Sequence, residues 1–309
     1  MGTSRWDAKT WTSYSKTTTA KPAAAIFTNV KLDTDLNPLG VVVRESRDSD
    51  ANPNSNAIIV AVDVTGSMGM LADYFVKTGL GVLFEHIYDR KPVSDPHVMF
   101  MAIGDAYYDT TPLQVSQFEA DISIAKQLEK VYIEHGGGGN GFESYELPWY
   151  FAAFKTSIDC FEKRNKKGYL FTIGDEETPP RVKASQIRQF LGDTIEADIS
   201  IEQMYETVSK MYNVYHIIVA EGGNCRIGNM GKVVRETWTN LMGEHAIWLT
   251  DHTKLSEVIE SIIEVNEGRT VDSVASSWSG DTSLVVKTAI SGLSNNLTTT
   301  SDSSTIVRF

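Results

Sequence analysis

Short apolar runs alternate with amphipathic stretches along most of the chain. The runs are nearly continuous and rich in Val and Ile, as in strands buried on both faces of a parallel sheet; they occupy residues 57–63, 97–104, 169–173, 214–220 and 246–249. Apolar residues three or four apart predict helices between them, at 67–90, 117–130, 144–165, 201–212, 233–242 and 254–265. A short run at 112–115 predicts an edge strand. This alternation predicts an α/β fold with an open, doubly wound, mostly parallel sheet and helices on both faces.

The two ends of the chain differ from this central part. Residues 1–56 are rich in Ser, Thr, Asp, Asn and Pro, yet include Trp6, Trp11 and Tyr14, which predicts an arm that either lies over the domain or binds a partner. From Ser276 onward, 15 of 34 residues are Ser or Thr, too polar to form a separate core. Apolar residues at 284–286 indicate a strand added to an edge or a segment docked in a groove. We therefore divide the chain into an arm (1–56), one domain (57–266) and a tail (267–309).

Charge narrows the classes of partner. The chain has 28 Lys and Arg against 40 Asp and Glu, a formal net charge of -12 at pH 7, which disfavours binding to nucleic acid or to an anionic membrane surface. No apolar run is long enough to span a membrane, and the first residues lack the apolar core of a signal peptide. The two cysteines stand apart, as expected in a reducing compartment. We expect a cytoplasmic protein, or a virion-associated one if a phage encodes it.

Oxygen-bearing side chains gather where two predicted strands end. Asp63, Thr65 and Ser67 alternate along the chain as it leaves the strand 57–63, so their oxygens can converge above the sheet edge. Asp175 follows the strand 169–173 at the same edge. Hard oxygen ligands of this kind suit Mg²⁺, with Mn²⁺ or Ca²⁺ as alternatives. A glycine-rich stretch at 136–141 then leads to Glu143 and Ser144 at the predicted start of a helix, and either one can complete the site.

This pattern resembles the metal-ion-dependent adhesion site of von Willebrand factor type A domains, over residues 57–266. Asp63, Thr65 and Ser67 match the D-x-S/T-x-S element, and Asp175 matches the distal Asp. Where the family has a Thr, this chain has Glu143-Ser144; Ser144 replaces the hydroxyl, or Glu143 binds the metal as in the integrin β branch. The resemblance implies a six-position sheet with an antiparallel edge strand at 112–115. It also implies a non-catalytic module whose metal accepts an Asp or Glu of a protein partner, and intracellular bacterial members commonly work beside MoxR-type AAA+ ATPases.

Two other functions fit parts of the sequence. The chain can be a structural component of a phage or secretion-like particle that assembles through its arm and tail. It also resembles a serine hydrolase at Ser67, since the sequence from 65 to 69 approximates the G-x-S-x-G turn and Asp175 precedes His216 and His245 in order. However, Thr65 stands where that turn needs Gly, and His216 lies inside a predicted strand, so we expect no catalytic residue.

The acidic residues expected together at the sheet edge are Asp63, Asp105, Glu143, Asp175, Glu176 and Glu177.

Overall fold

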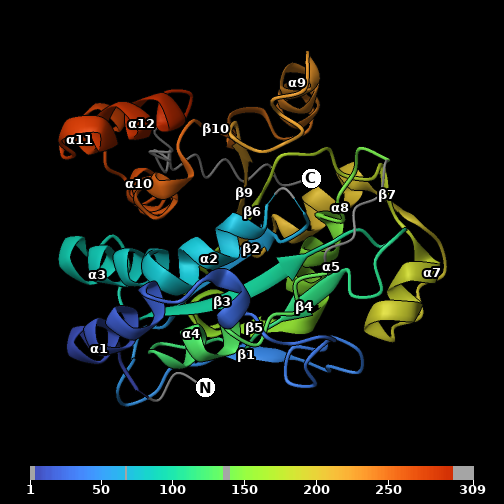
Figure 1. The fold of residues 1–309 in the computed structure, drawn as a ribbon, viewed down its shortest axis with the longest axis horizontal. Helices are drawn as coiled ribbons and strands as arrows, with labels where there is room; N and C mark the ends of the chain where they lie inside the picture. The colour runs from blue at the N-terminus through green and yellow to red at the C-terminus, as the bar shows by residue number, and fades with distance from the viewer. Residues whose placement is uncertain (1–3, 67, 135–139, 295–309) are drawn as a thin grey trace, which may run out of the picture.

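A central six-stranded sheet organises the chain in a computed structural model, which describes residues 4–66, 68–134 and 140–294 (Figure 1). The strand order is β10-β9-β6-β2-β3-β4, and every neighbouring pair is parallel except β3 and β4. The strands are β2 (Asn56–Asp63), β3 (Pro96–Ile103), β4 (Leu113–Val115), β6 (Gly168–Gly174), β9 (Tyr212–Val219) and β10 (Ala246–Leu249). The predicted α/β fold is confirmed, and so is the antiparallel edge strand.

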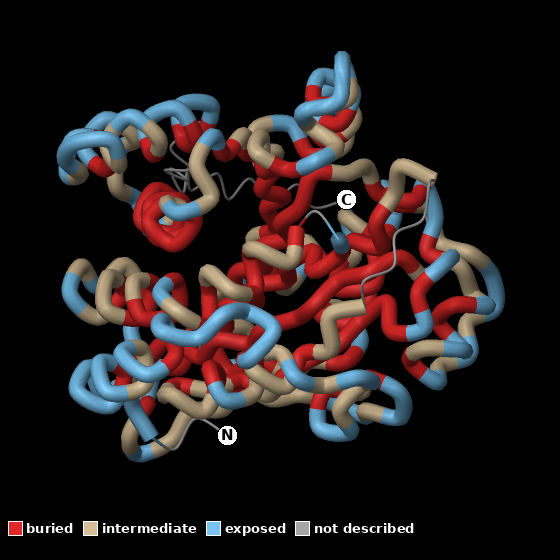
Figure 2. Tube along the Cα trace, in the orientation of Figure 1, coloured by how far each residue is buried: buried red, intermediate tan, exposed pale blue. Residues whose placement is uncertain are grey.

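Each face of the sheet has its own apolar core. Along β2, Ile58, Val60 and Val62 belong to one core, whereas Ile59 and Ala61 belong to the other. This alternation follows from the two-residue period of a strand and explains why the apolar run is continuous. Figure 2 shows the central strands buried along their length. The sheet is therefore covered on both sides, as a doubly wound architecture requires.

The helices divide between the two cores. The first core receives α1 (Ala8–Thr19), α2 (Gly69–Tyr74), a π-helical turn (Phe75–Gly79), α3 (Leu80–Arg90), α4 (Ser123–Leu128), α10 (Leu255–Asn266), α11 (Val271–Ser276) and α12 (Gly280–Ile290). The second receives α5 (Glu146–Lys155), α6 (Asp159–Glu162), α7 (Ala184–Gln186) with a π-helical turn (Ile187–Leu191), α8 (Ile201–Val208) and α9 (Met230–Met242). Loops that leave the carboxyl ends of the strands thus run to opposite faces.

The N-terminal arm packs on the first core. Trp11 of α1 is buried, and Trp6 stacks on Phe84 of α3 with ring centroids 4.4 Å apart. A side chain at Gly81 would collide with the Trp11 indole, since a Cβ there would lie 1.9 Å from Nε1. The glycine is therefore what allows α1 to approach α3. The arm's aromatic side chains are used within the chain.

The C-terminal segment is helical as far as the structure describes it. Residues 284–286 lie in α12 and not in a strand, and Val286 is buried. Helices α11 and α12 cover α10, whose residues from Leu255 to Val265 are all buried (Figure 2). Arg90 of α3 holds α10 from its other side through Glu260 and Glu264. The tail is thus an outer layer on the first core.

Two predicted helices are shorter than their apolar patterns indicate. The stretch 117–130 contains only α4, and the stretch 144–165 is interrupted by β5 (Thr156–Ile158). β5 pairs in parallel with β1 (Arg44–Ser46) of the arm, and the β-branched Thr156 and Ile158 favour the extended conformation. A second small sheet joins β7 (Arg181–Val182) to β8 (Ile199–Ser200). Among the described residues, no helix is both long and apolar enough to cross a membrane.

Candidate metal centre at the carboxyl edge of the sheet

The strand order reverses between β2 and β6. The chain runs from β2 outward to β3 and β4, then returns to β6 on the other side of β2 and continues to β9 and β10. In open α/β sheets, the crevice at such a switch point is where ligands bind. Asp63 is the last residue of β2, and Asp175 follows Gly174 at the end of β6. The fold alone therefore directs attention to these two carboxylates.

Asp63 is fully buried and held by three hydrogen bonds. Its Oδ1 accepts from the backbone N–H and the hydroxyl of Thr65, at 2.8 and 2.6 Å. Its Oδ2 accepts from the phenol of Tyr145 at 3.2 Å. Tyr145 directly precedes α5, so this bond ties the end of β2 to the start of that helix. Ser67, the third member of the predicted motif, lies outside the described residues.

Glu143 and Ser144 occupy different environments although they are adjacent. The Ser144 hydroxyl is fully buried and its Oγ accepts a hydrogen bond from the N–H of Ala106 at 2.9 Å. The Glu143 side chain is also buried, but its Oε2 has no hydrogen-bond partner. A buried carboxylate oxygen without a partner is costly unless something else binds it. Glu143 therefore has a buried oxygen without a partner, whereas the Ser144 oxygen already accepts one hydrogen bond.

Asp175 and Glu176 follow β6 and contact the loop after β9. The backbone N–H of Asn224 donates to Asp175 Oδ2 at 2.7 Å, and the Asn224 amide donates to Glu176. Asp175 Oδ1 and Glu176 Oε2 are buried without partners. Gly222 makes this approach possible, because a Cβ there would lie 2.4 Å from Asp175 Cβ. Asn224 was not predicted from the sequence, where only its position after the strand 214–220 points to the sheet edge.

The acidic side chains at this edge repel one another electrostatically. Burial and the charges of Asp175 and Glu176 raise the pKa of Asp63. Burial, followed by the charges of Asp63 and Glu176, raises the pKa of Glu143 well above its usual range. Burial and Asp175 raise the pKa of Glu176 to about 7. Each ionised form is thus disfavoured by burial and by the neighbouring negative charges.

Two more of the predicted acidic residues have other partners. Asp105, after β3, accepts hydrogen bonds from the backbone of Tyr107 and the side chain of Asn140, each at 2.8 Å. Its charge still raises the pKa of Glu143, so it belongs to the rim of the acidic edge. Glu177 instead accepts a hydrogen bond from the Thr237 hydroxyl of α9 at 2.5 Å. Its partner thus lies on α9.

The donor set suits a hard cation. Glu143 Oε2, Asp175 Oδ1 and Glu176 Oε2 are buried carboxylate oxygens without partners, and oxygen donors are those that Mg²⁺ prefers. Among the described residues, these carboxylates do not bring three oxygens within 4.8 Å of one another. A cation here therefore needs hydroxyl and water oxygens as well, in keeping with the several waters that Mg²⁺ usually retains.

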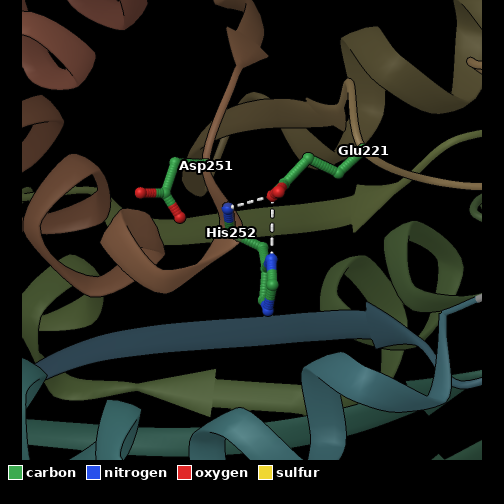
Figure 3. A group of neighbouring side chains, drawn as sticks. All are labelled: Glu221, Asp251 and His252. Carbon is green, nitrogen blue, oxygen red and sulfur yellow. Dashed lines mark hydrogen bonds and ion pairs between the residues drawn. The ribbon is translucent and has the colours of Figure 1, made fainter.

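A second group of possible ligands lies at the ends of β9 and β10 (Figure 3). Glu221, Asp251 and His252 each have one ligand atom within 4.8 Å of the others. Glu221 Oε2 accepts from the His252 backbone N–H at 2.7 Å and lies 2.8 Å from Nδ1 of the same residue. Asp251 Oδ1 accepts from the backbone and hydroxyl of Thr253. These internal hydrogen bonds account for the cluster as a link between two loops.

The two histidines considered for a hydrolase, His216 and His245, contact other groups. His216 is fully buried in β9, stacks on Trp238, and has Nδ1 2.9 Å from the hydroxyl of Thr172. Burial lowers the pKa of His216 well below its usual value. Nδ1 of His245 lies 2.9 Å from the carbonyl oxygen of Val214. In the described parts of the chain, neither histidine has a hydrogen bond to Asp175.

Comparison with known proteins adds nothing to the fold and the site described above. No family model and no curated protein sequence matches the chain. Similar solved structures include two of the pilus adhesin SpaC from Lactobacillus rhamnosus GG, one in an open conformation, with identities of 8% and 9% and TM-scores of 0.46 and 0.45. Each covers 72% of this chain, which corresponds to 31% and 32% of the adhesin chains. At this similarity, the adhesin tells us nothing about the function of this protein.

Proposed function

We propose that this protein is a von Willebrand factor A-type module that binds a protein partner through Mg²⁺. The observation that carries the proposal is the pair of unpartnered, buried oxygens at the switch point, Glu143 Oε2 and Asp175 Oδ1. Both belong to side chains that are at most 3% exposed. A divalent cation is the simplest group that satisfies such oxygens and also offsets the repulsion among the carboxylates.

The residues divide the work of holding the ion. Thr65 and Ser67 supply hydroxyl oxygens, and Asp63 and Asp175 act through the water shell of the ion. Glu143 supplies a charged ligand in place of Ser144, because the Ser144 oxygen already accepts a hydrogen bond from Ala106. Mn²⁺ and Ca²⁺ are alternatives to Mg²⁺ with the same donor preference.

The ion supplies a coordination position that an external carboxylate can occupy. The partner is therefore a protein that presents an Asp or Glu side chain, within an intracellular assembly of the kind in which A-type modules work beside MoxR-type AAA+ ATPases. Such a module recognises and does not transform its ligand, so we assign it no catalytic residue. Because Glu143 adds negative charge beside the ion, the attraction for an acidic ligand is weaker than at a site built from hydroxyls alone.

Cation titration of the full chain tests the proposal. We expect Mg²⁺ to raise the unfolding temperature of the wild type and to bind with a stoichiometry of one in calorimetry, because a ligand of the folded state stabilises it. Glu143→Gln and Asp63→Asn should lose most of this effect. Glu221→Gln is the matched control, because it removes a carboxylate from the other cluster and should keep the wild-type response.

Capture of a protein partner tests the proposed recognition function. Protein retained from a lysate of the source organism in Mg²⁺, and released by EDTA, should be absent when Asp63→Asn is the bait. If Mg²⁺ neither binds nor stabilises the wild type, or if Glu221→Gln alone removes the response, the proposed metal site is wrong. If Mg²⁺ binds at Asp63 but no captured protein depends on it, the recognition function is wrong.

A further inference from the structure

A cavity of about 660 Å³ lies directly beside the acidic edge, between the loop after β6 and helices α8 and α9. Phe142 and Glu177 form an isolated parallel bridge, and both line this cavity. Their neighbours Glu143 and Glu176 belong to the acidic edge. The bridge is therefore a wall shared by the candidate metal centre and the cavity, so one bound segment can reach both.

The lining of the cavity combines apolar surface with carboxylates. Its apolar part consists of Phe142, Pro180, Ile201, Tyr205 and Leu241. Three glutamates, Glu177, Glu202 and Glu206, also line it, and among the described residues no Lys or Arg does. Such a cavity favours an apolar side chain next to a positive charge.

The three carboxylates are free of ion pairs in the described structure, which records none within 4.0 Å for them. Glu177 accepts from the Thr237 hydroxyl, a neutral donor that leaves its charge in place. The backbone N–H of Glu202 itself, then the Ser200 hydroxyl and, more weakly, the charge of Arg181 lower the pKa of Glu202. Glu206 is exposed on α8. Glu177, Glu202 and Glu206 thus give this rim a negative charge, which Arg181 offsets in part at Glu202.

One wall also carries an unused polar group. Thr178 is 6% exposed and lines the cavity, and its hydroxyl oxygen is buried without a hydrogen-bond partner. Hydroxyls buried in this way normally have a partner. A donor from a bound peptide would supply one once the Thr178 side chain turns its hydroxyl, which is not exposed to the cavity in this structure, toward it. This is an observation independent of the charges of the rim.

We propose that this cavity binds a basic and apolar segment of the partner, a Lys or Arg flanked by an aliphatic residue, next to the carboxylate that the metal receives. The assignment rests on the proposed function for its second contact, the metal. The apolar group fills the space over Ile201 and Leu241, and the cation lies among Glu177, Glu202 and Glu206. The partner is thus recognised by an acidic and a basic residue close together, which a metal site alone does not require.

Three labelled peptides test the binding of a basic residue in the cavity without the metal. We would use fluorescein-labelled Gly-Leu-Xaa-Leu-Gly amides in which Xaa is Lys, norleucine or Glu, and follow their anisotropy with the full chain in EDTA. We expect the Lys peptide to bind about fivefold more tightly than the norleucine peptide, because two or three partly exposed carboxylates act on one charge. The Glu peptide should bind weakest, and added salt should reduce the difference.

Matched variants locate the effect. Glu206→Gln should reduce the preference for Lys over norleucine, whereas Glu236→Gln, the same change at an exposed residue of α9 outside the lining, should not. Equal binding of the three peptides, or equal effects of the two variants, would overturn the proposal. Because this assay contains EDTA, its result does not depend on the metal. Failure of Mg²⁺ to bind in the calorimetric experiment would refute the metal contact. It would not affect the proposed binding of a basic residue in the cavity.

Discussion

The phenol of Tyr145 donates a hydrogen bond to Oδ2 of Asp63 across 3.2 Å, and both side chains are fully buried. The bond joins the end of β2 to the start of α5, two elements more than 80 positions apart in the chain. Gly174 leaves the space for it, since a Cβ there would lie 1.9 Å from the Tyr145 oxygen. The geometry of the candidate metal centre therefore depends on a residue that binds no ion.

Tyr145→Phe should destabilise the protein in EDTA by about 1–3 kcal/mol, because one oxygen of a buried carboxylate loses the only donor that the described residues give it. Urea unfolding measures the change. Tyr150→Phe is the control, because its phenol donates to the partly exposed Asp193 at 3.1 Å and its loss should cost less. Equal losses in the two variants would show that burial of the Asp63 oxygen does not matter.

Gly222→Ala should weaken Mg²⁺ binding and cost about 1–3 kcal/mol of stability through overpacking. A Cβ at this position would lie 2.4 Å from Asp175 Cβ and Cγ, so the carboxylate must move. The measurement is the Mg²⁺-induced shift in unfolding temperature. Gly292→Ala serves as the control, since nothing lies within 4 Å of its Cβ position, and it should behave as the wild type.

Glu146→Met should stabilise the protein by about 1–3 kcal/mol, the cost of burying a polar group without a partner. Glu146 is fully buried in the first turn of α5, and neither carboxylate oxygen has a hydrogen bond. Burial raises its pKa well above the usual value, so burial disfavours the ionised form. Thermal unfolding at pH 7 checks the gain. A marked loss of stability would mean that Glu146 has a partner that we have not recognised.

His97 should make the protein less stable as the pH falls from about 6.5 toward 4. The residue is 1% exposed, and burial lowers its pKa from 6.5 to about 4. The unfolded chain therefore takes up a proton first, so the contribution of His97 is complete above pH 6.5 and is lost on acidification. Between pH 6.5 and 4, the free energy of unfolding should lose about 3 kcal/mol through His97.

Comparing the pH dependence of the free energy of unfolding in the wild type and in His97→Gln isolates this residue from the other titrating groups. The variant should have the shallower acid slope below pH 6.5. The Gln amide can still hydrogen-bond with Ser46, whose hydroxyl lies 3.1 Å from His97 Nδ1. Identical slopes would show that His97 is protonated in the folded state as readily as in the unfolded one.

The sheet was predictable because each buried strand is an apolar run with a distinct end. Asp63 and Asp175 stand immediately after such runs, and parallel strands bring their carboxyl ends to one edge. Tyr145 and Asn224 were not predicted, because their roles depend on which loops meet above that edge. The interruption of the helix at Thr156 depends likewise on β1, more than 100 residues earlier. Local periodicity carries no information about partners so distant in sequence.

The choice between Glu143 and Ser144 also needed the structure. Both residues have oxygen ligands, both follow the glycine-rich stretch, and the sequence leaves either one possible. What separates them is the N–H of Ala106, which donates to the Ser144 oxygen from the loop after β3. Donors of the backbone have no signature in a side-chain pattern, so this kind of competition can be seen only in three dimensions.

The covered position of α10 determines what any displacement of it would involve. When a helix with a solvent-exposed face slides along its sheet, its outer side exchanges contacts with water only. α10 has no solvent-exposed face over most of its length, since α11 and α12 pack against it. Arg90 of α3 also forms ion pairs with Glu260 and Glu264 of this helix. A shift of α10 would therefore have to break its contacts with α11 and α12 or move these two helices with it.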